Sequence, residues 1–194
     1  MQDADFAIDR ISRDKLFTQL QHGILLNQNR KKYWVDKMGK NCFMLYARDL
    51  SITWSENNNY WTWRQLKDAS EESIEIAELV NVCWLEVHGK FDTKKLSPAS
   101  LYEVTFVVML KCPARGWKIP VNVALNLPDG SKQERKVSML QQPKEQWMEI
   151  PVGEFRTSPE MLGEIQVSMY EFDGGKWKGG LIIKGVKIQP KTEC

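Results

Sequence analysis

The sequence has few of the residues on which most catalytic and metal sites depend. Its 194 residues include two histidines, His22 and His88, and four widely separated cysteines, Cys42, Cys83, Cys112 and Cys194. Zinc sites draw their ligands from closely spaced pairs, and no CxxC pair is present. A serine–histidine–aspartate site needs a histidine base, whereas His22 lies at an expected domain edge and His88 lies within an apolar strand. We therefore expect no cofactor, no metal and no enzymatic activity.

Long runs of one kind of residue are also absent. The 27 basic and 25 acidic residues give a net charge of +2, and no five like charges are consecutive, so we expect no nucleic-acid partner. No segment approaches the ~18 to 20 apolar residues of a membrane-spanning helix. The acidic opening, residues 1–6, lacks the apolar core of a secretory signal. These features predict a cytoplasmic protein with reduced thiols.

Short strands separated by turn residues dominate the pattern of the chain. Residues 119–127 alternate apolar and polar side chains, as a half-buried strand does, and residues 102–110 are expected to be the companion strand. Pro128, Asp129 and Gly130 are typical of a turn. Further strands are expected at residues 147–152, 164–172 and 181–188. We predict an all-β fold, an antiparallel β-sandwich that is jelly-roll-like.

One short helix is expected before the strands. Residues 5–20 carry a broken apolar stripe with charged residues between its members. From His22 onward the pattern is that of strands. The chain therefore divides into an N-terminal helical extension, residues 1–21, and one domain, residues 22–194, because its length leaves little room for a second core.

An aromatic segment, residues 47–63, organises the chain and holds three of its eight tryptophans. A polar loop at residues 55–59 interrupts the segment, and the candidate binding residues lie beside this loop or at its end: Trp54, Asn59, Tyr60 and Trp61. Aromatic faces can cover the apolar face of a sugar ring while amide groups bond its hydroxyls. The alternative is that the tryptophans belong to the core, as strand tryptophans commonly do.

Two carboxylates lie on the strand expected at residues 164–172. Counting by twos, Glu171 falls on the apolar face and would sit at the mouth of the sandwich, because an unpaired buried carboxylate is costly. The alternative is a side chain that turns to solvent at a frayed strand end. Glu164 falls on the opposite face about 23 Å away, which rules out a glycosidase pair. Trp177 and Lys178 follow the next turn and could wall the same mouth, or merely anchor the loop.

The aromatic segment is followed by further motifs in a fixed order. They are ARDLSITW and YWTW within residues 47–63, VCWLEV at residues 82–87 followed by Gly89 and Lys90, and segments at residues 147–150, 153–155 and 184–188. Together they resemble the Nictaba domain, the lectin domain shared by tobacco agglutinin and the phloem protein 2 lectins, over residues 24–190. The resemblance implies a lectin that binds N-acetylglucosamine oligomers, as chito-oligosaccharides or as the cores of N-glycans on glycoproteins, and that forms a homodimer.

The resemblance also implies sugar-binding roles for the residues that match those of the family, namely Trp54, Trp61, Glu164 and Glu171. Because the two carboxylates face opposite ways, we favour Glu171. A second function stays open: a structural phloem-filament module in which Cys194 and edge strands mediate assembly and sugar binding is weak or absent. The lysine-rich nuclear-targeting loop of tobacco agglutinin has no match in residues 128–136. Nuclear import is therefore not expected, and phloem sap joins the cytoplasm as an expected location.

Overall fold

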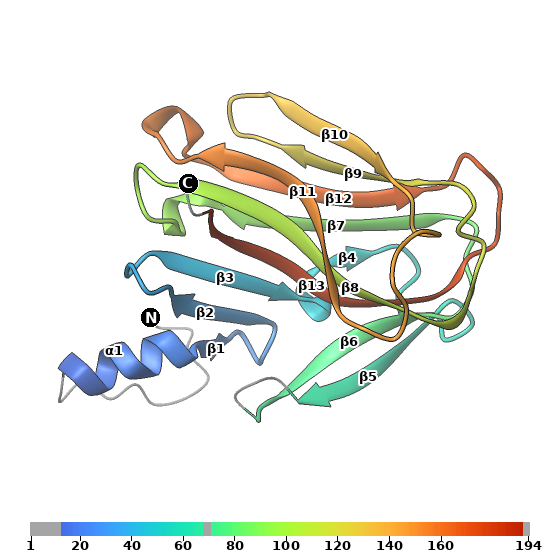
Figure 1. Ribbon diagram of the computed structural model, residues 1–194, viewed down its shortest axis with the longest axis horizontal. Coiled ribbons are helices and arrows are strands. Elements are labelled where there is room, and N and C mark those ends of the chain that lie inside the picture. Colours follow the sequence, from blue (N-terminus) through green and yellow to red (C-terminus); the bar gives the residue numbers. More distant parts are fainter. Residues whose placement is uncertain (1–12, 68–70, 192–194) are drawn as a thin grey trace.

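Two antiparallel sheets face each other in the computed structural model, which describes residues 13–67 and 71–191 (Figure 1). The larger sheet has eight strands: β1 (Ile24–Leu26), β2 (Lys31–Val35), β3 (Asn41–Tyr46), β13 (Gly179–Pro190), β6 (Ser73–Leu79), β5 (Trp61–Lys67), β8 (Leu101–Arg115) and β11 (Met148–Arg156). The smaller sheet has five strands: β10 (Lys132–Val137), β9 (Val121–Asn126), β12 (Glu164–Glu171), β7 (Leu85–Asp92) and β4 (Ser51–Ile52). The predicted all-β antiparallel sandwich is confirmed.

Strand β13 lies at the centre of the larger sheet. One edge of β13 pairs with β8, and its other edge pairs with β3 at residues 185–188 and with β6 at residues 182–183. A Cβ atom at Gly185 would lie 2.0 Å from the carbonyl oxygen of Leu45 on β3. Only glycine permits this close approach of the two backbones, so Gly185 allows β13 to pair with β3.

The core lies between the two sheets and follows the alternation of the sequence. On β9, Val121, Val123 and Leu125 are buried, whereas Asn122 and Asn126 on the other face are partly exposed. The expected companionship of this strand with residues 102–110 is wrong, because β8 pairs with β11 and β13 whereas β9 pairs with β10 and β12. Alternation shows which face of a strand is buried but leaves its neighbour undetermined.

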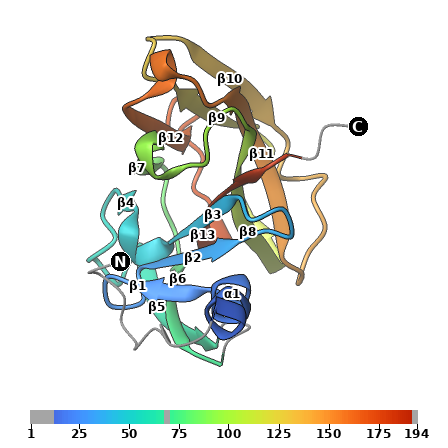
Figure 2. The same ribbon diagram turned by 90° about the vertical axis from the view of Figure 1, so that its left-hand side faces the viewer.

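The helix α1 (Arg13–His22) precedes the sheets and lies beside β2 (Figure 2). It ends two residues beyond the predicted helix at 5–20, and residues 5–12 of that prediction lie outside the described residues. None of its ten residues is buried. In the described part of the chain no helix is long and apolar enough to span a membrane.

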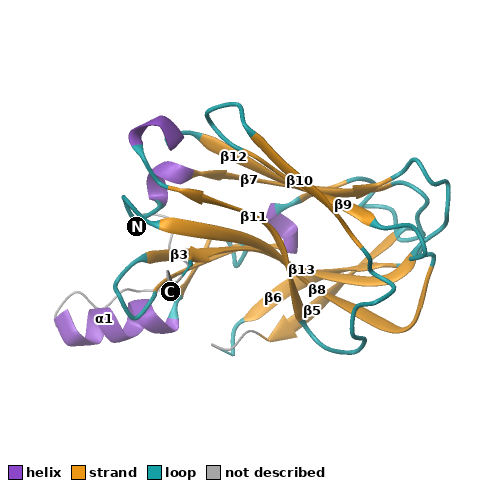
Figure 3. Ribbon diagram, turned by 45° about the horizontal axis from the view of Figure 1, so that its top comes forward, coloured by secondary structure: helices purple, strands orange, loops and turns teal. Residues whose placement is uncertain are grey.

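The two ends of the sandwich are closed by different connections (Figures 1 and 3). At one end lie the short 3-10 helices η2 (Thr93–Lys95) and η3 (Pro159–Met161); we call this the turn end. At the other end, which we call the loop end, lie the loops at residues 53–60, 80–84 and 172–178, which join β4 to β5, β6 to β7 and β12 to β13. The loops at residues 116–120 and 138–147, which join β8 to β9 and β10 to β11, lie at the same end. A third 3-10 helix, η1 (Ala47–Asp49), leads into β4.

Candidate ligand-binding site

The loop end gathers three exposed tryptophans, one from each of the loops at residues 53–60, 80–84 and 172–178. Trp54, Trp84 and Trp177 are 48%, 41% and 51% exposed. Isolated exposed aromatic residues are ordinary on a protein surface, but a group on neighbouring loops marks a candidate binding site. The loop end is therefore where we look for a ligand.

The loop at residues 53–60 is a series of tight turns that its own hydrogen bonds hold in place. The amide of Asn57 donates to the Trp54 carbonyl at 3.0 Å, and the amides of Tyr60 and Trp61 donate to the Asn57 carbonyl at 2.9 and 3.0 Å. The indole Nε1 of Trp63 donates to the Ser55 carbonyl at 3.0 Å. Most of the loop's geometry is thus set before any ligand arrives.

Trp54 is held in an unusual backbone conformation within this loop. Its φ angle is 62°, in the left-handed region that bulky residues avoid, at a cost of roughly 1–3 kcal/mol. Its ring lies 5.3 Å from that of Tyr60, centroid to centroid, with the planes tilted by 39°. Asn59, one residue before Tyr60, is exposed and donates its backbone amide to Asn57 Oδ1 at 3.0 Å. Three of the predicted site residues, Trp54, Asn59 and Tyr60, are thus brought together.

Trp61 does not belong to this exposed group. It is the first residue of β5, it is fully buried, and it is one of the largest side chains of the core. A side chain without accessible surface cannot cover a sugar ring, so the expectation that Trp61 contacts a sugar directly is not met in this structure. Alternation explains the difference: β5 begins at Trp61 with that side chain facing the other sheet, whereas Trp54 lies in a turn and obeys no alternation.

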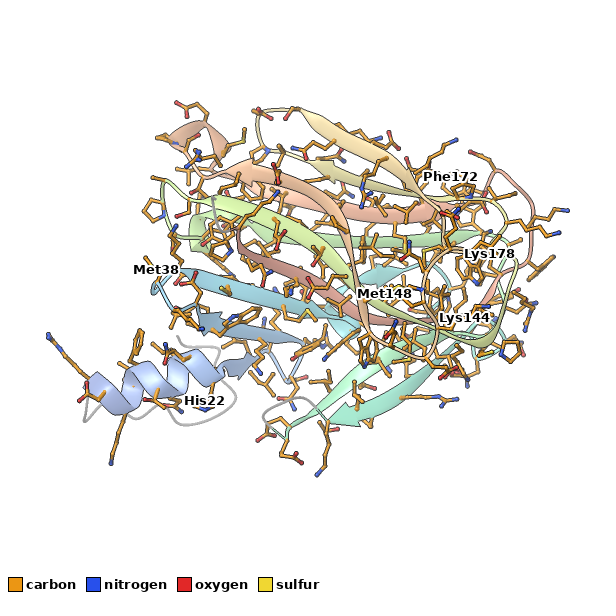
Figure 4. The ribbon with its side chains drawn as sticks, in the orientation of Figure 1. His22, Met38, Lys144, Met148, Phe172 and Lys178 are labelled. Atoms are coloured by element: carbon orange, nitrogen blue, oxygen red, sulfur yellow. The ribbon has the colours of Figure 1, made fainter. Side chains whose placement is uncertain are left out.

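Glu171 and Lys178 form a buried ion pair. Figure 4 labels Lys178, which lies where the loop end meets the core. The side chains of Glu171 and Lys178 are 4% and 0% exposed. Glu171 Oε1 also accepts from the Gly174 amide at 2.8 Å, and Lys178 Nζ also donates to the carbonyls of Cys83 and Lys176 at 3.0 and 2.9 Å. Glu171 lies on the apolar face at the strand's end, as the count predicts. Its partner is Lys178 in place of a ligand, so neither side chain is open to a sugar.

This ion pair joins two of the three loops that carry exposed tryptophans. Lys178 belongs to the 172–178 loop and bonds to Cys83 in the 80–84 loop, and the backbones of Val82 and Lys178 exchange hydrogen bonds of 3.0 and 2.7 Å. Trp84 directly follows Cys83, and Trp177 directly precedes Lys178. The buried charges therefore fix the loops that carry two of the exposed tryptophans.

Glu164 lies far from this group, at the turn end of β12. Its side chain is 57% exposed and forms an ion pair with Lys90 at 2.9 Å. It faces outward from the smaller sheet, whereas Glu171 faces inward, as the count by twos predicts. The structure therefore separates the two carboxylates that the resemblance pairs.

Trp84, Phe172 and Glu86 were missed by reasoning from the sequence. The rings of Trp84 and Phe172 stack with centroids 4.3 Å apart and planes 15° from parallel. Glu86 Oε2 accepts from Trp84 Nε1 at 2.8 Å and from Thr53 Oγ1 at 3.0 Å. The signal was hidden because it depends on strand register: Leu85 pairs with Glu171, which makes Trp84 and Phe172 the next cross-strand neighbours.

His88 lies in a hydrogen-bonded chain on the outer face of the smaller sheet. Its Nε2 is 3.0 Å from Glu86 Oε1, and its Nδ1 is 2.8 Å from Ser168 Oγ. A carboxylate only accepts, so Nε2 donates to Glu86, and in the neutral ring Nδ1 accepts from the hydroxyl. Ser168 is 4% exposed in the middle of β12. Although hydrolases use these residue types, this hydroxyl is closed to a substrate.

The described cysteines are Cys42, Cys83 and Cys112, all with free thiols. Burial, together with the negative charge of Asp36, raises the pKa of the Cys42 thiol to about 12. Cys194 lies outside the described residues. In the ranges that the structure covers, no group of three or more histidine, cysteine or acidic residues is arranged to hold a metal ion.

Residues 40–190 match the phloem protein 2 family. The chain belongs to this family. It is 48% identical over 194 residues to Protein PHLOEM PROTEIN 2-LIKE A1 of Arabidopsis thaliana, across 98% of this chain and 78% of that protein. It is 46% identical over 179 residues to a protein named Lectin from Luffa acutangula, across 91% of this chain and 84% of that protein.

Solved structures resemble the chain only loosely. The CBM22-1 xylan-binding domain of Paenibacillus barcinonensis Xyn10C superposes with a TM-score of 0.41 at 8% identity, across 77% of this chain and 90% of that one. At that score the likeness carries no argument about the site. The phloem protein 2 match is more informative, since residues 40–190 include all the loops of the loop end and leave out only α1, β1 and β2 among the described elements on the N-terminal side.

Proposed function

We propose that this member of the phloem protein 2 family is a lectin that binds N-acetylglucosamine oligomers at its loop end, without catalysis. The observation that carries the proposal is the group of exposed tryptophans, Trp54, Trp84 and Trp177, on three loops tied to one another through buried contacts. Its ligands would be chitin fragments and the cores of N-glycans on glycoproteins. The relative named Lectin supports the general activity.

The primary contact would be made by the pair of rings in the 53–60 loop. Trp54 and Tyr60 offer apolar faces for the C–H face of a sugar, and the exposed Asn59 amide can bond a hydroxyl or an acetamide group. Because the loop is already fixed by its own hydrogen bonds, little conformational entropy is lost on binding. Trp177 would close the site from the neighbouring loop.

The buried residues would act by holding these contacts in place. Trp61 supports the 53–60 loop from the core, and the Glu171–Lys178 pair fixes the 80–84 and 172–178 loops. Glu164 is left out of the site because it lies at the other end of β12, on the outward face. The proposed site thus keeps seven of the eight candidate residues. Trp54, Asn59, Tyr60 and Trp177 would contact the ligand, and Trp61, Glu171 and Lys178 would support them.

Titration with N,N′,N″-triacetylchitotriose tests the proposal. We expect the wild-type protein to bind, and the Trp54→Ala variant to lose about tenfold or more in affinity, since a stacked aromatic contributes on the order of 1 kcal/mol beyond its buried area. Phe17→Ala is the matched control, because Phe17 is 44% exposed but lies on α1, away from the loop end. A cello-oligosaccharide of equal length, which lacks the acetamide groups, should bind more weakly. Equal affinities of the wild-type protein and the Trp54→Ala variant would contradict the proposed site.

The homodimer and the cytoplasmic or phloem location stay predictions. The alternative function, a structural filament module, depends on Cys194, which lies outside the described residues. The edge strands of the larger sheet are β1, β5 and β11, and those of the smaller sheet are β10 and β4, so edge strands exist for assembly in any such protein. Among the residues that the structure describes, no specific contact favours that function over sugar binding.

A further inference from the structure

We propose that Trp84, Phe172 and Glu86 form a second sugar subsite on the outer face of the smaller sheet, continuous with the loop-end site. The ligand of this protein would then be a chain of several sugars that runs from Trp54 past Trp84. This inference rests on the proposed function and adds to it the length of the ligand and a second set of contacts.

The ring stack gives the subsite an apolar platform of fixed orientation. Phe172 covers one face of the Trp84 indole with nearly parallel planes, and Tyr170 continues the stack, with its ring centroid 5.6 Å from that of Phe172. The 41% of Trp84 that stays exposed therefore lies on its opposite face and its edges. The hydrogen bond from Trp84 Nε1 to Glu86 fixes the indole further. A rigid, half-exposed indole face is what stacking against a sugar requires.

Glu86 supplies a charged acceptor beside this platform. A carboxylate has about four acceptor positions. Three are occupied, by Trp84 and Thr53 on Oε2 and by His88 on Oε1. The side chain is still 29% exposed, which leaves Oε1 able to accept a bond from a sugar hydroxyl. Hydrogen bonds from His88 and Trp84 also hold the pKa of the Glu86 carboxyl below its usual value, so that it stays charged.

The two subsites are adjacent through Thr53. The Thr53 amide donates to the Glu86 carbonyl at 3.0 Å, and the Thr53 hydroxyl bonds the same carboxylate oxygen as the Trp84 indole. Trp54 is the next residue after Thr53. One oligosaccharide can therefore reach both tryptophans along the seam between the 53–60 loop and β7.

The surroundings favour a sugar over an apolar protein surface. Beyond the ring stack, the outer face of the smaller sheet carries His88 and Glu134, and the Tyr170 hydroxyl bonds to Glu134. A small apolar platform bordered by hydrogen-bonding groups suits a carbohydrate, whereas a protein interface needs a larger apolar centre.

Titrations of the full chain with oligomers of two lengths test the inference. With chitohexaose we expect the Trp84→Ala variant to bind about three- to tenfold more weakly than the wild-type protein, and with N,N′-diacetylchitobiose we expect no difference. Glu86→Gln keeps the shape of the side chain and should give a smaller loss, again only with the hexamer. Lys90→Gln is the matched control on the same strand and should bind both ligands as the wild-type protein does.

The outcomes separate this inference from the proposed function. Equal losses with both oligomers would place Trp84 in the first subsite, and no loss with the hexamer would remove it from binding; either result overturns the second subsite. If Trp84→Ala lowers the unfolding midpoint strongly, Glu86→Gln decides alone by the same criterion. Failure of the wild-type protein to bind either oligomer would overturn the proposed function as well.

Discussion

The loop end and the turn end close the same core by different chemistry. At the turn end, neutral hydroxyls bond to backbone carbonyls: Thr93 Oγ1 donates to the Met161 carbonyl at 2.6 Å, and Thr157 Oγ1 donates to the Ser97 carbonyl at 2.8 Å. At the loop end the closure is the Glu171–Lys178 ion pair. The large apolar side chains exposed at the turn end include Met38 and Leu162, neither of which is aromatic, whereas those at the loop end include three tryptophans, Trp54, Trp84 and Trp177.

This difference indicates that the loops of the loop end are the ones that need to be held in one arrangement. Moving two charges out of water costs several kcal/mol for each ion, and a hydroxyl–carbonyl bond closes the turn end without that cost. A charged pair with several further hydrogen bonds accepts few alternative geometries. Its position under the exposed tryptophans is therefore consistent with a role in fixing the loops for binding.

Among the changes at the two ends, we expect the largest loss of stability from a substitution at Trp61. Trp61→Ala should lower the free energy of unfolding by about 3–5 kcal/mol, because it empties a large volume of the core. Trp54→Ala, seven residues earlier, should change stability little and should lose affinity instead. Urea unfolding curves of both variants check this. A stable Trp61→Ala variant with weak sugar binding would return Trp61 to the contact surface.

The next effect concerns the buried ion pair. Glu171→Gln leaves the Lys178 charge without its partner and should cost about 3 kcal/mol or more of stability. The double variant Glu171→Leu with Lys178→Met removes both charges and should recover most of that loss. We expect both variants to bind chitotriose more weakly than the wild-type protein, because the loops lose their fixed junction.

Thr157→Val is the matched control for the ion pair, since it removes the closure at the turn end. It should lower stability by roughly 1–3 kcal/mol through the unpaired carbonyl and amide groups of Ser97 and Ser100. Its affinity for chitotriose should be unchanged. Equal losses of affinity in Thr157→Val and Glu171→Gln would contradict a particular role of the loop-end ion pair in binding.

The smallest effect is expected at Glu164. Its ion pair with Lys90 is more than half exposed on both sides, and such pairs contribute about 0–1 kcal/mol. Glu164→Gln should therefore change neither the unfolding midpoint nor the affinity for chitotriose beyond a small margin. A loss of affinity as large as that of Trp54→Ala would show that a ligand reaches the turn end of β12.

Much of the fold could be predicted from the sequence because strand alternation is a local signal. The count by twos placed Glu171 inward and Glu164 outward, and both positions are confirmed. What could not be predicted depends on which strands are neighbours. The stack of Trp84 on Phe172 and the partnership of Lys178 with Glu171 both arise from contacts between separate segments, which periodicity does not reveal.

The tryptophans of the aromatic segment show the same limit within a single motif. Trp54 and Trp61 have the same side chain and flank the same loop, yet one is 48% exposed and the other is fully buried. Composition indicates that such a segment is important, but only the turn conformation at Trp54 decides which ring faces solvent. The sequence therefore indicates the segment that carries the exposed ring but not which of its tryptophans that ring belongs to.

Because β13 lies at the centre of the larger sheet, this sheet can be completed only late in the synthesis of the chain. A ribosome releases the N-terminal strands first, and β3, β6 and β8 meet in one sheet only through β13, which is made after all of them. Until it emerges, the larger sheet exists as separate pieces with unpaired edges, which are prone to aggregate. Pairings between residues distant in sequence also form slowly. The nascent protein therefore depends on protection until residues 179–190 are free, and a message truncated before them would yield fragments with no middle strand to join.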